Sequence, residues 1–107
     1  MAKGTESEKT FRLERDLEAA CCRLAKAAGW YCRKLSGPGH RSMPDRMFIR
    51  RGIVLFIEFK RPGERPGPLQ VYVIDLIRKQ GFEVILVDNI IDGRKAIRRF
   101  VGDTDSS

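Results

Sequence analysis

Histidine and cysteine are both scarce in this 107-residue sequence. His40 is the only histidine, which argues against metal centres built on two histidines. The three cysteines, Cys21, Cys22 and Cys32, are odd in number and form no CxxC or Cys–His pair. A disulfide framework and a structural zinc site are therefore not expected. We interpret the cysteines as small buried hydrophobic residues of a protein in a reducing compartment.

Long apolar runs and low-complexity linkers are missing as well. The longest apolar run, residues 52–57, is far shorter than a membrane span, and the lysine-containing N-terminus has no apolar signal core. Gly37 and Gly39 are not followed by a phosphate-binding pattern such as GxxxxGK. We expect a single cytoplasmic domain with no membrane segment and no nucleotide cofactor.

The charge is strongly positive. Lys and Arg number 21 against 14 Asp and Glu, which gives a net charge of +7 and a pI of about 9.8. This balance suits a polyanionic partner such as nucleic acid, although solubility and attraction to membrane surfaces also produce basic proteins. A chain of this length buries a modest share of its surface, which makes pairing with a second copy plausible.

The hydrophobic pattern changes period several times and predicts the element order α-β-β-β-α-β-α. Apolar residues recur at three- and four-residue steps in three predicted helices, at residues 11–28, about 69–80 and 92–99, the last with Asp92 as its cap. Strands are predicted at residues 30–35, 45–50, 53–60 and 82–87. The last strand is a continuous apolar run of the kind that is buried on both faces. Residues 10–101 are thus predicted to form one α/β domain, a small sandwich with a mixed sheet, between polar tails at residues 1–9 and 102–107.

The two central strands are predicted to form a tight hairpin. Residues 45–50 and 53–60 are separated only by Arg51 and Gly52, and Gly52 is free to adopt a positive φ. Such a turn brings Asp45, at the start of the first strand, toward the level of the end of the second strand. A carboxylate is therefore expected beside the residues that end this strand.

The end of the second strand adds two more charged groups. Side chains alternate along a strand, so Glu58 and Lys60 project from the same face. Phosphodiester hydrolysis needs a hard cation, and Mg²⁺ prefers carboxylate oxygens and water. Asp45, Glu58 and the backbone carbonyl of Phe59 can supply the oxygens, and Lys60 can orient a water or stabilise transition-state charge. The alternative is a set of cross-strand ion pairs at a solvated sheet edge.

Pro44-Asp45, a hairpin and Glu58-Phe59-Lys60, in this order, resemble the PD-(D/E)xK nuclease signature. Within that superfamily the chain resembles the VRR-NUC family, and the resemblance covers roughly residues 11–100. Its matching segments are ERDLE (14–18), SGPGHRSMPDR (36–46), VLFIEFKRPG (54–63), PLQ (68–70) and GFEVILVD (81–88). Ser42 and Met43 depart from the glycine and the small apolar residue that relatives usually have, which affects the shape of the loop.

This resemblance implies a small restriction-endonuclease-like fold and Mg²⁺- or Mn²⁺-dependent cleavage of DNA. It matches the metal ligands to Asp45 and Glu58, with the Phe59 carbonyl between them, and the catalytic lysine to Lys60. An acidic residue of the first helix is expected to join the metal site. Glu14 is the better match, since it borders the apolar stripe of that helix and can face the sheet.

Glu18, one turn further along the first helix, is the competing candidate. Gln70 matches the family's glutamine on the helix after the E-x-K strand, which organises the site or touches the phosphate. Stand-alone members of this length resemble phage-encoded proteins. They are expected to act as homodimers on branched DNA such as four-way junctions, in the host cytoplasm if phage-encoded. The alternative is a non-catalytic DNA-binding module that keeps the nuclease fold.

Further basic residues are candidates for phosphate contacts. Those predicted to surround the site are Arg41, Arg46, Arg50, Arg51, Arg61 and Arg65, and those on the last helix are Lys95, Arg98 and Arg99. His40 either contacts a phosphate or is an ordinary loop residue. Trp30 is interpreted as a core residue and not as a platform for base stacking.

Overall fold

The computed structural model describes residues 13–37, 39 and 42–105, with side chains described as far as residue 99. The predicted order of elements is confirmed. The elements are α1 (Glu14–Ala27), β1 (Tyr31–Lys34), β2 (Arg46–Arg50), β3 (Ile53–Phe59), α2 (Pro68–Lys79), β4 (Glu83–Val87) and α3 (Ile90–Asp105). Within the described ranges, no helix is both long enough and apolar enough to cross a lipid bilayer.

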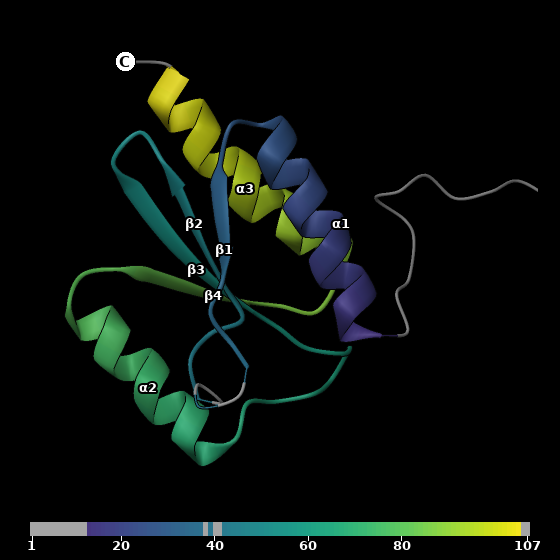
Figure 1. Ribbon diagram of the computed structural model, residues 1–107, viewed down its shortest axis with the longest axis vertical. Helices are drawn as coiled ribbons and strands as arrows, with labels where there is room; N and C mark the ends of the chain where they lie inside the picture. The colour runs from purple at the N-terminus through teal and green to yellow at the C-terminus, as the bar shows by residue number, and fades with distance from the viewer. Residues whose placement is uncertain (1–12, 38, 40–41, 106–107) are drawn as a thin grey trace, which may run out of the picture.

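The strands form one mixed sheet in the order β1-β2-β3-β4. β1 pairs with β2 and β2 pairs with β3 in antiparallel orientation, while β4 runs parallel to β3 after the crossover through α2. α1 and α3 lie side by side over one face of the sheet, and α2 lies on the other face (Figure 1). The predicted small α/β sandwich is therefore confirmed.

The main hydrophobic core lies between the sheet and the α1–α3 pair. Its fully buried members include Leu55, Ile57 and Phe59, the face of β3 opposite to that of Glu58. Trp30 is only 3% exposed and its ring meets Phe48 edge-on, with ring centroids 6.4 Å apart, so its prediction as a core residue is confirmed.

The cysteines also contribute to this core. Cys21 and Cys22 are buried and Cys32 is half-buried, which agrees with their interpretation as small hydrophobic residues. The Sγ atoms of Cys22 and Cys32 lie 3.4 Å apart as free thiols. Burial, together with the neighbouring Cys32 thiol, raises the pKa of Cys22 to about 12, so its thiol is protonated and unreactive at neutral pH.

The hairpin between β2 and β3 has the predicted two-residue turn. Gly52 has a φ of 82° and Arg51 a φ of 49°, as a turn that matches the right-handed twist of its strands requires. Arg50 pairs with Ile53, and Arg46 pairs with Ile57. Because Asp45 precedes Arg46, this register places Asp45 beside the residues of β3 that follow Ile57.

Two predictions about the end of the chain were wrong in detail. β4 is not buried on both faces, because it is an edge strand: Val84 and Val87 are buried, but Leu86 is 43% exposed. α3 is longer than residues 92–99 and includes positions assigned to the tail. Its first turn is capped by Asn89, whose side-chain oxygen accepts the backbone N–H of Asp92 at 2.8 Å, so Asp92 is not the cap.

Candidate functional site

Asp45 is held at the junction between the preceding loop and β2. Pro44 is fully buried beside it, and the backbone carbonyl of Asp45 accepts the N–H of Leu35 at 2.8 Å. Its side-chain Oδ2 accepts the backbone N–H of Phe59 at 2.8 Å. The carboxylate is thus fixed beside the last residues of β3, where the hairpin spacing predicted it.

Glu58 is a buried carboxylate next to Asp45. It is 3% exposed, and its Oε2 accepts a hydrogen bond from Gln70 Nε2 at 2.8 Å and lies 3.2 Å from Lys60 Nζ. Burial, and then the negative charge of Asp45, raise the pKa of Glu58 to about 6, although Lys60 and Gln70 act in the opposite direction. Two carboxylates therefore share one site at a cost in electrostatic energy.

Lys60 and Gln70 complete a compact polar cluster. Lys60 Nζ donates to Gln70 Oε1 at 3.0 Å, while the amide of Gln70 donates to Glu58. The same Gln70 oxygen accepts the N–H of Gly67 at 3.4 Å at the start of α2. Gln70 thus ties the first turn of α2 to both charged residues of β3, which fits the organising alternative of the sequence prediction.

Glu14 begins α1 at the same edge of the sheet. Burial, a hydrogen bond with Glu64 and the charge of Glu64 raise its pKa, and the charges of Lys60 and Asp45 also act on it. A hollow of about 370 Å³ is lined here by Leu13, Glu14, Arg15 and Arg61. Glu14 therefore lies near the cluster, with Glu64 as its hydrogen-bond partner.

Glu64 was not singled out from the sequence. Its Oε1 accepts the backbone N–H of Arg61 at 3.0 Å, and this bond, together with the hydrogen bond from Glu14, lowers its pKa. The sequence did contain a signal for it. Glu64 follows Lys60 by four residues in a segment rich in proline and glycine, and a turn there can bring a side chain back to the end of the strand.

Glu18 faces a different set of partners. Its Oε2 lies 2.5 Å from Arg46 Nε and 3.4 Å from Lys34 Nζ, and its side chain is 10% exposed. These two cations already neutralise the carboxylate and hold α1 against β1 and β2. The two candidates from α1 thus differ in surroundings: Glu14 lies with the cluster, and Glu18 is a buried carboxylate paired with Arg46 and Lys34.

Substitution of the two helix glutamates should separate these roles. If the cluster binds Mg²⁺ and cleaves DNA, Glu14→Gln is expected to weaken both about 10- to 100-fold, the range found for residues that support metal ligands. Glu18→Gln should instead lower the thermal midpoint, because Arg46 would lose its buried partner, while cleavage per folded molecule stays near that of the wild type. Cleavage assays and thermal unfolding of both variants measure this. Equal cleavage by the two variants would show that Glu14 has no part in the cluster's activity.

The cluster fits a divalent cation completed by water and backbone oxygen. Within residues 13–37, 39 and 42–105, no group of three His, Cys, Asp or Glu side chains is arranged to hold a metal by itself. Glu58 Oε1, however, is buried and has no hydrogen-bond partner among the described residues. A buried carboxylate oxygen is costly unless a donor or a cation satisfies it. Asp45 and Glu58 offer carboxylate oxygens, which, with backbone carbonyl oxygen and water, are the class of ligand that Mg²⁺ prefers.

The predicted basic surroundings are only partly available for a ligand. Arg46 is paired with Glu18, and Arg50 Nε donates to the backbone carbonyl of Ala28 at 2.9 Å, so both have structural contacts. Arg61 and Arg65 are exposed, and Arg61 Nε lies 3.8 Å from Glu64 Oε1. The predictions for His40 and Arg41 lie outside the described residues.

Comparisons with known proteins found one similar solved structure and one similar phage protein. No family model matches the chain. A solved structure described as "VRR_NUC domain" is similar with a TM-score of 0.73 and 28% sequence identity, over 81% of this chain and 96% of that chain. "Putative nuclease p44" of Acyrthosiphon pisum secondary endosymbiont phage 1 is 37% identical over 57 residues, or 52% of this chain. The match spans 61% of that relative's length.

The structural similarity covers nearly all of the solved domain. Asp45 lies at the entrance to β2, Glu58 and Lys60 lie at the end of β3, and Gln70 lies in the first turn of α2. The phage relative agrees with a phage-type member. By its fold and the order of these motifs, the chain is similar to the VRR-NUC domain.

Proposed function

We propose that this protein is a Mg²⁺- or Mn²⁺-dependent endonuclease that hydrolyses DNA phosphodiester bonds at the cluster of Asp45, Glu58 and Lys60. The observation that supports this most is the buried, unpaired Oε1 of Glu58 beside a second carboxylate. A module that only binds DNA would gain nothing from two carboxylates facing a phosphate. The name of the phage relative and the net charge of +7 are consistent with a nuclease.

Each residue of the cluster has a distinct task in this reaction. A divalent cation held by Asp45 and Glu58 would neutralise developing phosphate charge and acidify a water molecule. The Phe59 N–H fixes the Asp45 carboxylate in one orientation. Lys60, between Glu58 and Gln70, places a positive charge at the strand end for the phosphate or the attacking water. Glu14 contributes a further carboxylate from α1.

Lys60→Ala should lower cleavage by roughly 10²- to 10³-fold, the effect of losing one preorganised charge-stabilising group. Lys60 is an ion-pair partner of buried Glu58, so the variant loses that pairing and would lose stability in metal-free buffer. The thermal midpoints of the variant and the wild type are therefore compared in Mg²⁺, which can neutralise Glu58 instead. Lys79→Ala, which removes an exposed lysine from the end of α2, is the matched control and should cleave normally. A large loss of stability with retained specific activity would identify Lys60 as a structural ion-pair partner.

We further propose a homodimer formed through α2 and β4. Ile74 is the only α2 residue that is buried, whereas an apolar surface is left exposed by Leu69 (62%), Tyr72 (60%), Leu76 (43%), Phe82 (43%) and Leu86 (43%). An exposed apolar surface of this kind beside a sheet edge suits an isologous contact with a second copy. α2 also contains Gln70, so a dimer formed through α2 would place the clusters of both subunits near the dimer interface.

Substitution in this apolar surface should disrupt the dimer. Tyr72→Glu/Leu76→Glu is expected to convert dimers into monomers at micromolar concentration, because it places charge in a desolvated contact. Tyr31→Glu is the control, since Tyr31 is 55% exposed on the opposite edge strand. Light scattering measures the mass of each. A wild-type protein that is monomeric, or a double variant that remains dimeric, would contradict this interface.

Branched DNA is the proposed preferred substrate, in the cytoplasm of a host cell. Two clusters on one dimer can reach two strands of a four-way junction at once. Competition between labelled junctions and linear duplexes at several salt concentrations tests this. Affinity should fall steeply with salt while the preference for the junction persists, since shape sets the preference. Equal cleavage of linear and branched DNA would refute the preference and leave the metal site standing.

A further inference from the structure

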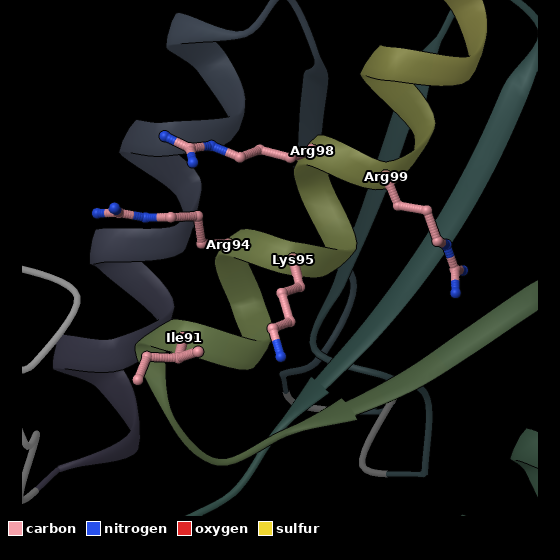
Figure 2. Close-up of a pocket in the computed structure, with 5 residues that line it drawn as sticks. All are labelled: Ile91, Arg94, Lys95, Arg98 and Arg99. Carbon is pink, nitrogen blue, oxygen red and sulfur yellow. The ribbon is translucent and has the colours of Figure 1, made fainter.

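A basic groove lies on the outer face of α3, apart from the cluster described above. Ile91, Arg94, Lys95, Arg98 and Arg99 line a hollow of about 590 Å³ (Figure 2). Most of these residues follow three- and four-residue steps and therefore share one side of the helix. Figure 2 shows Arg94 and Arg98 extending across α1, Lys95 lying between the other cations, and Arg99 reaching toward the strands. We call these five residues the α3 groove.

Three of the four positive charges of the α3 groove have no acidic partner among the described side chains. Arg99 lies 3.3 Å from Glu83, but no such contact exists there for Arg94, Lys95 or Arg98. The Nε of Arg94 is buried without a hydrogen-bond partner in the described part of the chain. Like charges this close destabilise the free protein slightly, and an anionic ligand relieves that repulsion.

Among the side chains of α3 that the structure describes, up to residue 99, the one acidic residue does not neutralise them. Asp92 Oδ2 accepts a hydrogen bond from Asn89 Nδ2 at 2.9 Å, and its backbone N–H is bound by the same side chain. Its carboxylate is therefore directed toward the helix cap. The α3 groove remains a surface of net positive charge with one apolar residue, Ile91, which is 46% exposed.

The α3 groove begins at the same end of the sheet as the carboxylate–lysine cluster, although α3 covers the opposite face. The backbone N–H of Lys60 donates to Val87 at the end of β4, and α3 starts three residues later at Ile90. From Ile91 to Arg98 the helix rises about 10 Å, which is about three base-pair steps of a duplex. The helix positions that carry the cations thus span, along the axis of α3, a length comparable with a few phosphates of a nucleic-acid backbone.

We propose that the α3 groove binds the phosphodiester backbone of duplex DNA that flanks the cleaved bond. The inference rests on the proposed function in that DNA is the substrate. Lys95 and Arg98, both exposed, contact successive phosphates, Arg94 supports them, and Ile91 packs against sugar carbons. A single small anion would leave most of this charge unused, so a chain of phosphates is the better occupant.

Binding of a labelled duplex and a labelled junction tests this, measured in EDTA by fluorescence anisotropy between about 50 and 300 mM salt. Lys95→Gln/Arg98→Gln should weaken binding on the order of tenfold at 0.1 M salt and reduce the salt slope by about 1.8, or about 0.9 per lost phosphate contact. Lys95→Gln alone should give about half of the slope change. Lys79→Gln, on the other face of the sheet, removes the same charge and should bind as the wild type does.

Wild-type cleavage in Mg²⁺ is measured alongside, so that the two proposals can fail separately. Normal binding by the double variant, or an equal loss in Lys79→Gln, overturns the α3 groove while the nuclease proposal stands if the wild type cuts. Binding that depends on Lys95 and Arg98 without any cleavage supports the α3 groove and refutes catalysis. A wild type that neither binds nor cuts DNA overturns both.

Discussion

Asp45→Asn is expected to reduce DNA cleavage on the order of a thousandfold, which corresponds to about 4 kcal/mol of transition-state stabilisation. The asparagine keeps the shape of the side chain and a carbonyl oxygen that can accept the Phe59 N–H, so the β2–β3 hairpin should stay intact. What the variant lacks is the negative charge that holds a cation. DNA affinity should persist or increase, because one anion facing the phosphate is gone.

Single-turnover cleavage and DNA binding by the same preparation measure this split. Asp75→Asn, an exposed substitution on α2, serves as the control for loss of one carboxylate and should cleave normally. Cleavage by Asp45→Asn at close to the wild-type rate would remove Asp45 from the reaction. A parallel loss of folding would show that the residue acts through the hairpin.

Glu58→Gln is expected to change stability and activity in opposite directions. The pKa of Glu58 is raised from 4.5 to about 6 by burial and by Asp45. The folded protein therefore binds the Glu58 proton more tightly than the unfolded chain does. This contribution to stability is fully present below pH 4.5 and is lost as the pH rises through 6. In metal-free solution at pH 8, the charged carboxylate costs about 2 kcal/mol, which the neutral glutamine avoids.

Denaturation in EDTA at pH 4.5 and at pH 8 measures this effect. Glu58→Gln should be more stable than the wild type at pH 8, with a smaller difference at pH 4.5, and it should not cleave DNA. Mg²⁺ should then stabilise the wild type and not the variant, since only the wild type has the carboxylate that binds it. Gln70→Glu is not a suitable control, because it adds charge to the cluster. A Glu58→Gln variant that is less stable at pH 8 would contradict the electrostatic description of the site.

Much of the central geometry follows from local rules. The two-residue spacing at Arg51-Gly52 leaves few alternatives to a tight hairpin, and strand alternation then places Glu58 and Lys60 on one face. Asp45 follows from the same register. These features depend on residues close in sequence, which is why the pattern alone could predict them.

The features that the sequence did not predict depend on long-range packing. The apolar pattern of β4 did not distinguish an edge strand from a central one, because strand order is a property of the whole sheet. Similarly, Glu14 and Glu18 both fit the helix periodicity. Only the packing of α1 places Glu18 between Arg46 and Lys34 and brings Glu14 to Glu64.

Cleavage of end-labelled DNA by the purified protein in Mg²⁺, in Mn²⁺ and in EDTA is the most direct test of a metal-dependent nuclease at Asp45, Glu58 and Lys60. We predict cut strands with either cation, none in EDTA, and recovery of cleavage when excess Mg²⁺ is returned. Asp45→Asn prepared in the same way should leave the DNA intact, which excludes a contaminating nuclease. Cleavage that continues in EDTA, or that Asp45→Asn performs equally well, would contradict the proposed site.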